Sequence, residues 1–123
     1  MSLASDAAAL SVERLRPAHL AETLLWLERD PVLHVYLTAL TLRDALGSPH
    51  DETWAARRGG AIDALLYLGG RSGAVLPHGD DPAALRQMAE VARERRESLP
   101  GRIQVIGPEE GVRAIVAAFR TDG

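Results

Sequence analysis

The chain is organised around the stretch from Ser72 to Arg96, which reads SGAVLPHGDDPAALRQMAEVARERR. Its short apolar run, Ala74–Leu76, predicts a strand, and the following Pro-His-Gly predicts the end of that strand. Asp81 and Pro82 are typical of a helix start, with a carboxylate as N-cap and proline in the first turn. A loop between a strand and a helix N-terminus is a frequent ligand site, because free backbone N–H groups meet there.

Composition limits the classes of function. The chain has 123 residues, 46% apolar and 25% charged, which predicts one globular domain. It has no cysteine and no lysine, which excludes disulfides, thiol nucleophiles and Schiff-base chemistry. The net charge of −3 argues against a nucleic-acid partner. The longest apolar run, Val32–Leu42, is too short to span a bilayer, so we expect a cytoplasmic protein with no membrane partner.

Upstream of the central stretch, the pattern predicts a flexible arm, one strand and two helices. Residues 1–10 are predicted to form the arm, and residues 11–16 alternate in the manner of a strand. A first helix is predicted from Pro17. The second, predicted from about Pro31 to Leu46 with Asp30 as its N-cap, is apolar almost all round and is expected to be heavily buried.

The remaining segments predict a mixed sheet covered by helices. Glycine turns at 58–60 and 69–73 separate short apolar runs, as in an antiparallel meander. A helix to about Glu97 then leads to a final strand, which should be parallel to its neighbour because a helical crossover links the two. A last helix is predicted from Gly107-Pro108. The predicted strands are 53–57, 61–68, 74–76 and 102–106.

This order of elements resembles that of the GNAT superfamily of N-acetyltransferases. Glu28–Leu37 and Ile103–Pro108 resemble segments of the degenerate GNAT-like domain that precedes a catalytic GNAT domain in some bacterial two-domain proteins. The resemblance runs from Val12 to Arg120. It implies an α/β fold in which 11–123 form one GNAT-like domain. By analogy with the two-domain proteins, it also implies that this domain can be the N-terminal part of a longer protein. The family pattern continues with two further strands, so an exposed sheet edge is expected to pair with another chain or domain.

The resemblance also implies where acetyl-CoA would bind. Catalytic relatives hold its pyrophosphate on an Arg/Gln-x-x-Gly-x-Gly/Ala loop. The matching segment here, residues 77–82, has one glycine, no arginine or glutamine, and two aspartates where phosphate charge would arrive. We therefore expect Asp80 and Asp81 to serve helix capping, and we predict no cofactor for this chain.

The sequence does not predict a catalytic residue or a metal site. The leaving-group tyrosine of the family belongs to the last helix, where this chain has Phe119. The four histidines lack metal-ligand spacing; His34 is predicted to be partly buried and hydrogen-bonded, and His78 to be a solvated loop residue. The mixed-charge run 93–97 is predicted to be a solvated face. If acetyl-CoA does bind, the candidate contacts are Val75, Leu76, His78 and Gly79.

Three functional hypotheses follow. The first is a non-catalytic GNAT-like domain that supports a catalytic acetyltransferase domain. The second is an active N-acetyltransferase with an atypical loop, in which acyl-CoA lies between the strands 74–76 and 102–106 with His78 near the thioester. The third is a freestanding module for dimerisation or for a small ligand.

Overall fold

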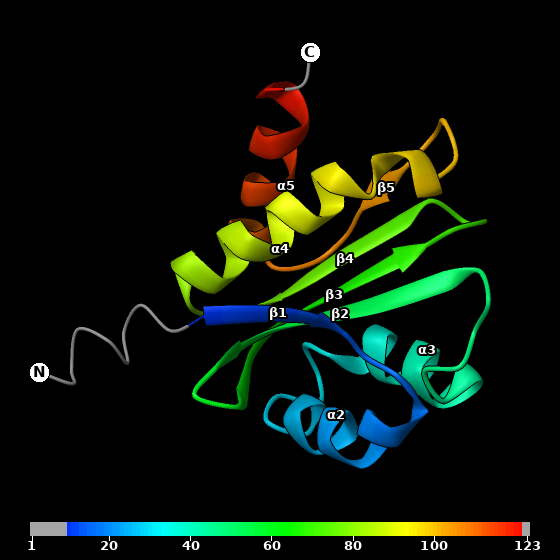
Figure 1. Cartoon of the computed structure of the whole chain (residues 1–123), viewed down its shortest axis with the longest axis vertical. Helices are drawn as coiled ribbons and strands as arrows, with labels where there is room; N and C mark the ends of the chain where they lie inside the picture. Colours follow the sequence, from blue (N-terminus) through cyan, green and yellow to red (C-terminus); the bar gives the residue numbers. More distant parts are fainter. Residues whose placement is uncertain (1–9, 122–123) are drawn as a thin grey trace, which may run out of the picture.

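The computed structural model describes residues 10–121 and forms a five-stranded sheet with two helices on each face (Figure 1). The predicted arm 1–10 lies outside the described residues except for Leu10, which begins the first strand. The elements in chain order are β1 (Leu10–Arg14), the 3-10 helix Pro17–His19, α2 (Leu20–Leu27), α3 (Val35–Asp44), β2 (Asp51–Arg58), β3 (Ala61–Gly69), β4 (Ala74–Gly79), α4 (Pro82–Glu94), the 3-10 helix Arg96–Ser98, β5 (Gln104–Val105) and α5 (Glu109–Thr121).

The sheet has the order β1-β2-β3-β4-β5, and this confirms the predicted mixed topology. The first four strands are antiparallel, whereas β5 is parallel to β4 and pairs only at its two residues. The turn between β2 and β3 uses Gly59 and Gly60, whose φ angles of 60° and 86° suit residues without a Cβ. An irregularity follows, because Ala56 pairs with Ala64 but Arg57 pairs with Ile62. Asp63 is therefore an extra residue, and Ile62 shares a face with Leu65.

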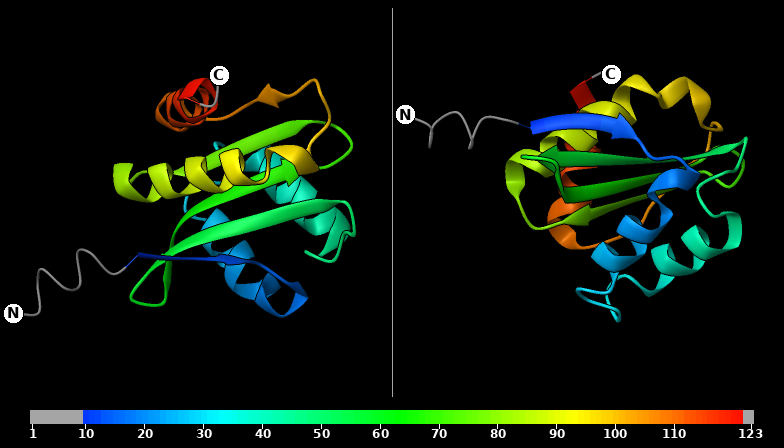
Figure 2. Two further views of the ribbon diagram at one scale, coloured as in Figure 1. Left: turned by 45° about the horizontal axis from the view of Figure 1, so that its top comes forward. Right: turned by 60° about the horizontal axis from the view of Figure 1, so that its bottom comes forward.

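The helices form two layers. In Figure 1, α4 and α5 lie above the sheet and α2 and α3 lie below it, and the views in Figure 2 show the same separation. Leu66, Val75 and Met88 are fully buried in the upper core between the sheet and α4 and α5. Leu37 and Leu65 are fully buried in the lower core, under α2 and α3.

Two strand predictions differ from the structure. Residues 77–79 do not end the third meander strand: β4 continues to Gly79, and Pro77 and His78 pair with Leu66 and Leu65 of β3. Pro77 is tolerated inside the sheet because it lies past the end of the short β5, where no neighbouring strand requires its missing N–H. The final strand is shorter than predicted, with two residues in place of 102–106.

The prediction that the second helix, from about Pro31 to Leu46, is heavily buried is wrong, because only Leu37, Leu40 and Thr41 of α3 are buried. Asp30 accepts a hydrogen bond from the Leu33 backbone N–H (3.1 Å), but the residues after it form turns and α3 begins only at Val35. Leu37 is buried, whereas Val35 is 63% exposed. Because a single helix layer covers this face of the sheet, only one side of α3 can reach the core.

Candidate functional site

The link between β4 and α4 is occupied by a helix cap. Asp81 accepts a hydrogen bond from the Ala84 backbone N–H (3.1 Å), which confirms the predicted capping for Asp81, whereas Asp80 is exposed and is not the N-cap residue of α4. The same carboxylate accepts a hydrogen bond from Arg58 of β2 (2.6 Å). Desolvation alone would raise the pKa of Asp81, but the bonds from Arg58 and Ala84 outweigh it and lower that pKa. The N-terminus of α4 thus already holds an anion, and that anion is paired with an arginine.

The region between β4 and β5 is closely packed where the strands part. The last bond between them joins the Ile106 N–H to the Val75 carbonyl (2.9 Å). Beyond it, a Cβ on Gly107 would lie 2.7 Å from the Pro77 oxygen, and a Cβ on Gly111 would lie 3.0 Å from the Pro77 side chain. The start of the last helix therefore lies directly against β4.

His78 is not the solvated loop residue that was predicted. It is only 3% exposed, because β4 carries it under the α2–α3 layer. Its ring meets His34 edge-on at 5.0 Å between centroids, and His34 stacks on Trp26 at 5.0 Å. Burial, reinforced by the neighbouring His34, lowers the pKa of His78 to about 4, so its imidazole is neutral at pH 7.

Two polar atoms of this cluster lack a partner. Trp26 Nε1 and His78 Nδ1 are buried and make no hydrogen bond among the described residues. The His34 prediction is confirmed: the residue is 5% exposed, and its Nδ1 lies 3.0 Å from the Leu27 carbonyl. Since that oxygen can only accept, Nδ1 of His34 is the donor. Unpartnered buried polar atoms are uncommon in proteins, so these two atoms are candidate contacts for a ligand.

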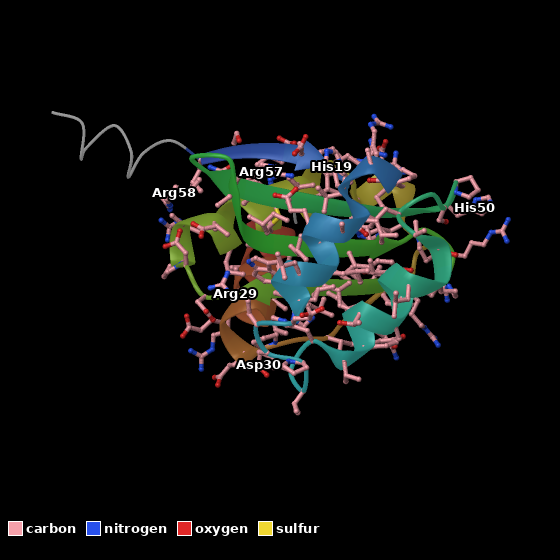
Figure 3. The ribbon with its side chains drawn as sticks, turned by 90° about the horizontal axis from the view of Figure 1, so that it is seen from below. His19, Arg29, Asp30, His50, Arg57 and Arg58 are labelled. Atoms are coloured by element: carbon pink, nitrogen blue, oxygen red, sulfur yellow. The ribbon has the colours of Figure 1, made fainter. Side chains whose placement is uncertain are left out.

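A cavity of about 180 Å³ lies beside the cluster. Arg29 borders it with its guanidinium 5.4 Å from the centre of the Trp26 ring, and Figure 3 shows Arg29 and Asp30 together on the segment that joins α2 to α3. The site thus combines one cation, two carboxylates, an indole and an imidazole around a space large enough for a few water molecules or a small organic group. The residues that line it are Trp26, Arg29, Asp30, Leu33, His34, Gly79 and Asp80.

The four candidate cofactor contacts are all in β4, but they do not share one surface. Val75 faces the upper core and Leu76 faces the lower one, and both side chains are buried. Gly79 borders the cavity and lies so close to β3 that a Cβ would be 2.8 Å from the Ala64 Cβ. His78 belongs to the aromatic cluster. Their role as cofactor contacts remains a prediction.

Trp26 and Arg29 were not predicted from the sequence as residues of a site. A signal for them was present, since Asp30-Pro31 breaks the helix between Trp26 and His34. Such a break can fold the two flanking segments onto each other and stack residues that are eight positions apart.

The other polar groups have structural roles. The Tyr67 hydroxyl donates to Asp51 (2.8 Å), and burial raises the Tyr67 pKa well above its usual value. Within residues 10–121, no group of three or more histidines and carboxylates is placed to hold a metal ion. In the same part of the chain, no helix has the length and apolar character needed to cross a membrane.

Comparison with known proteins supports the fold. No family model matches the sequence, and no curated protein sequence matches it significantly. Among solved structures, the chain is similar to a ribosomal-protein-alanine N-acetyltransferase from Brucella melitensis biovar Abortus 2308, with a TM-score of 0.57 and 14% identity over 89% of each chain. This likeness, together with the mixed sheet and its two helical layers, shows that the chain has the fold of a GNAT N-acetyltransferase.

Proposed function

We infer that this chain is a GNAT-fold domain that does not bind acetyl-CoA and that supports a catalytic acetyltransferase partner. The observation that carries this proposal is the filled N-terminus of α4. In a domain that binds a diphosphate there, the free N–H groups of the first turn face the ligand. Here the Asp81 carboxylate takes one of them and is held in place by Arg58.

Charge adds to the argument. Asp80 precedes Asp81, so an arriving diphosphate meets two carboxylates. Each like-charge contact costs on the order of 1 kcal/mol even in high dielectric. Arg58 does not offset this cost, because it is already paired with Asp63 at 3.0 Å as well as with Asp81.

Packing between β4 and β5 supports the same proposal. An acyl-CoA arm between these strands would need space beside Pro77. Gly107 and Gly111 approach Pro77 so closely that not even a methyl group fits without movement. Binding would therefore require α5 to shift away from β4.

Calorimetric titration of the chain with acetyl-CoA tests the proposal. We expect no saturable binding up to millimolar acetyl-CoA. The matched variant Asp80→Asn with Asp81→Asn removes both charges but keeps an amide oxygen as the cap, so it reports the effect of charge alone. Micromolar binding to the parent chain would overturn the proposal and favour an active acyltransferase.

The aromatic cluster favours a second candidate, a small-ligand module. Arg29 suits a carboxylate, and the unpartnered Trp26 Nε1 suits a hydrogen-bond acceptor. The chain has two tryptophans, so Trp54→Phe leaves Trp26 as the only indole reporter. Acetate and propionate are the probes. A saturable change in Trp26 emission that Arg29→Gln weakens would support this candidate, and a flat response would exclude these ligands.

A further inference from the structure

A second cavity, which we call the turn cavity, lies at the end of the sheet where β3 turns into β4. It has a volume of about 320 Å³ and shares no lining residue with the cavity beside Trp26. Its rim comes from the link 48–51 before β2 and from the turn 70–73 after β3, and α3 supplies a third wall. Figure 3 shows His50, in this rim, at the opposite end of the sheet from Arg58.

The two rim segments are held directly against each other. The Gly70 N–H donates a hydrogen bond to the Asp51 carboxylate (3.0 Å). Gly70 also lies so close to the His50 carbonyl oxygen that there is no room for a Cβ. Ser48 fixes the backbone of the link, because its Oγ accepts from the N–H groups of His50 (3.1 Å) and Asp51 (3.0 Å). The side chains of the rim therefore project from backbone that is already in place.

The rim presents hydrogen-bond donors that have no acceptor. A guanidinium nitrogen of Arg71 lies 2.7 Å from Nε2 of His50. Because a guanidinium can only donate, Nε2 is the acceptor and Nδ1 of His50 carries the ring hydrogen. The hydroxyls of Ser48 and Ser72 accept backbone N–H bonds, so each has its own hydrogen left to donate. Among residues 10–121, none of these remaining donors is hydrogen-bonded.

The two carboxylates of the turn cavity already have donors of their own. Asp51 accepts from the Tyr67 hydroxyl (2.8 Å) as well as from Gly70, and its side chain is only 15% exposed. Arg43 donates to Asp51 (3.3 Å) and to Asp44 (3.1 Å). The carboxylates therefore lower the affinity of the cavity for an anion, but they do not use the donors of the rim. An acceptor-rich ligand at the mouth of the cavity would use those donors.

We propose that the turn cavity binds a small oxyanion, with phosphate as the preferred kind. Arg71 supplies the positive charge and can donate to two oxygens at once. Nδ1 of His50 and the Ser72 hydroxyl add donors from the two rim segments, which suits a tetrahedral group better than a planar one. The inference does not depend on whether acetyl-CoA binds. Because the rim is exposed and its charge is screened, we expect a dissociation constant in the millimolar range.

Titration of the full chain with inorganic phosphate, followed by two-dimensional NMR at constant ionic strength, tests the proposal. We expect saturable shifts of the backbone amides in 48–51 and 70–73. Arg71→Gln should weaken binding about fivefold, and Ser72→Ala about twofold. Arg86→Gln, at an exposed position of α4, is the matched control and should leave the affinity unchanged. The amide spectrum itself reports that each variant is folded.

Sulfate and acetate distinguish the kinds of anion. Sulfate is tetrahedral like phosphate and should shift the same amides with similar affinity, whereas acetate is planar and should bind more weakly. Phosphate shifts that grow without saturation, or shifts confined to residues 26–34 beside the other cavity, would overturn the proposal. Equal weakening by Arg71→Gln and Arg86→Gln would overturn it too, because the effect would then be one of overall charge. Acetate binding as tight as that of phosphate would contradict the preference for a tetrahedral ligand.

Discussion

The helices α4 and α3 cover opposite faces of the sheet and differ in the side chains on their outer sides. Both helices press leucine or methionine side chains into the sheet, and Met88 and Leu37 are each fully buried. Their outer sides are opposites. The exposed positions of α4 include Arg86, Gln87 and Glu90, whereas those of α3 include Val35, Tyr36, Ala39 and Leu42. The outer side of α4 is therefore polar, whereas the outer side of α3 is mainly apolar.

The polar groups under the two layers differ as well. Adjacent arginines tie both layers to the sheet: Arg57 bonds Glu22 of α2 (2.6 Å), and Arg58 bonds Asp81 at the start of α4 (2.6 Å). In Figure 3 the two arginines lie together at the hairpin turn. Both unpartnered buried atoms, on Trp26 and His78, lie on the α2–α3 side. Among the described residues, the buried side-chain nitrogens and oxygens on the upper side all have a hydrogen-bond partner, whereas two on the lower side do not.

The largest effect is expected for Leu37→Ala, which probes the inner side of α3. Removing this fully buried side chain should lower the free energy of unfolding by about 2–5 kcal/mol. Val35→Ala, on the outer side of the same helix, should change it by less than about 0.5 kcal/mol. Urea denaturation at one fixed protein concentration measures both. Equal costs would mean that the outer side is already packed, and the contrast with α4 would fail.

The pH dependence of the free energy of unfolding tests the difference in polar pairing, because His78 is buried on the α2–α3 side. Its folded pKa is about 4, below the ordinary histidine value of about 6.5, so the unfolded chain binds the extra proton between these values. Stability therefore falls as the pH drops from 7 to 4. This one group contributes a loss of about 3 kcal/mol. His78→Leu should remove that part of the pH dependence, whereas His50→Gln, at an exposed position, should retain it. Denaturation at several pH values gives the slopes; identical slopes for His78→Leu and the parent would show that the imidazole is not buried neutral.

Arg95 tests the pairing on the α4 side. The run 93–97 was predicted to be a solvated face, but this prediction is wrong for Arg95, which binds the buried Glu52 of β2 (Nε to Oε1, 3.0 Å). Burial raises the pKa of Glu52, but hydrogen bonds from Arg95 and Trp54 outweigh it and lower that pKa. The stabilisation is therefore present at neutral pH and is lost as the pH falls through the folded pKa of Glu52.

At pH 7, Arg95→Ala should cost about 1–3 kcal/mol, because the buried Glu52 carboxylate loses the two hydrogen bonds that Arg95 donates. Arg113→Ala is the matched control. Arg113 pairs with Glu109 within α5 at the surface, so its loss should cost no more than about 0.5 kcal/mol. Thermal or chemical denaturation at pH 7 distinguishes the two variants. If they cost the same, the Glu52 contact contributes nothing beyond an ordinary surface ion pair.

Local signals in the sequence were sufficient for most of the fold. The glycine turns, the Asp81-Pro82 helix start and the helical crossover before β5 led to the correct mixed sheet. The extent of β4 could not be predicted, because proline ends a strand in most contexts and is accepted here only beside the short β5. The burial of His78 follows from that extent, so it could not be predicted either.

The exposure of the outer side of α3 could not be predicted from local sequence patterns either. A helix with apolar residues all round is compatible with a buried position or with a contact surface, and only the number of layers decides between them. The same limit applies to the cavity. Trp26 and His34 come together through a chain reversal at Asp30, and His78 joins them from a strand more than forty residues later.

The smallest effect concerns the cap that closes α4. Asp81→Ala removes the hydrogen bond from Ala84 and one of the carboxylate partners of Arg58. It should lower the free energy of unfolding by about 0.5–2 kcal/mol. Asp81→Asn keeps the cap but loses the charge, so its cost should be smaller. Asp80→Ala, at the exposed residue just before Asp81, should leave the free energy of unfolding almost unchanged. Denaturation of the three variants distinguishes the contribution of the helix cap to stability from that of the charge. If Asp80→Ala proves as costly as Asp81→Ala, the anion that fills the helix N-terminus is misassigned, and the argument against a diphosphate there loses its structural basis.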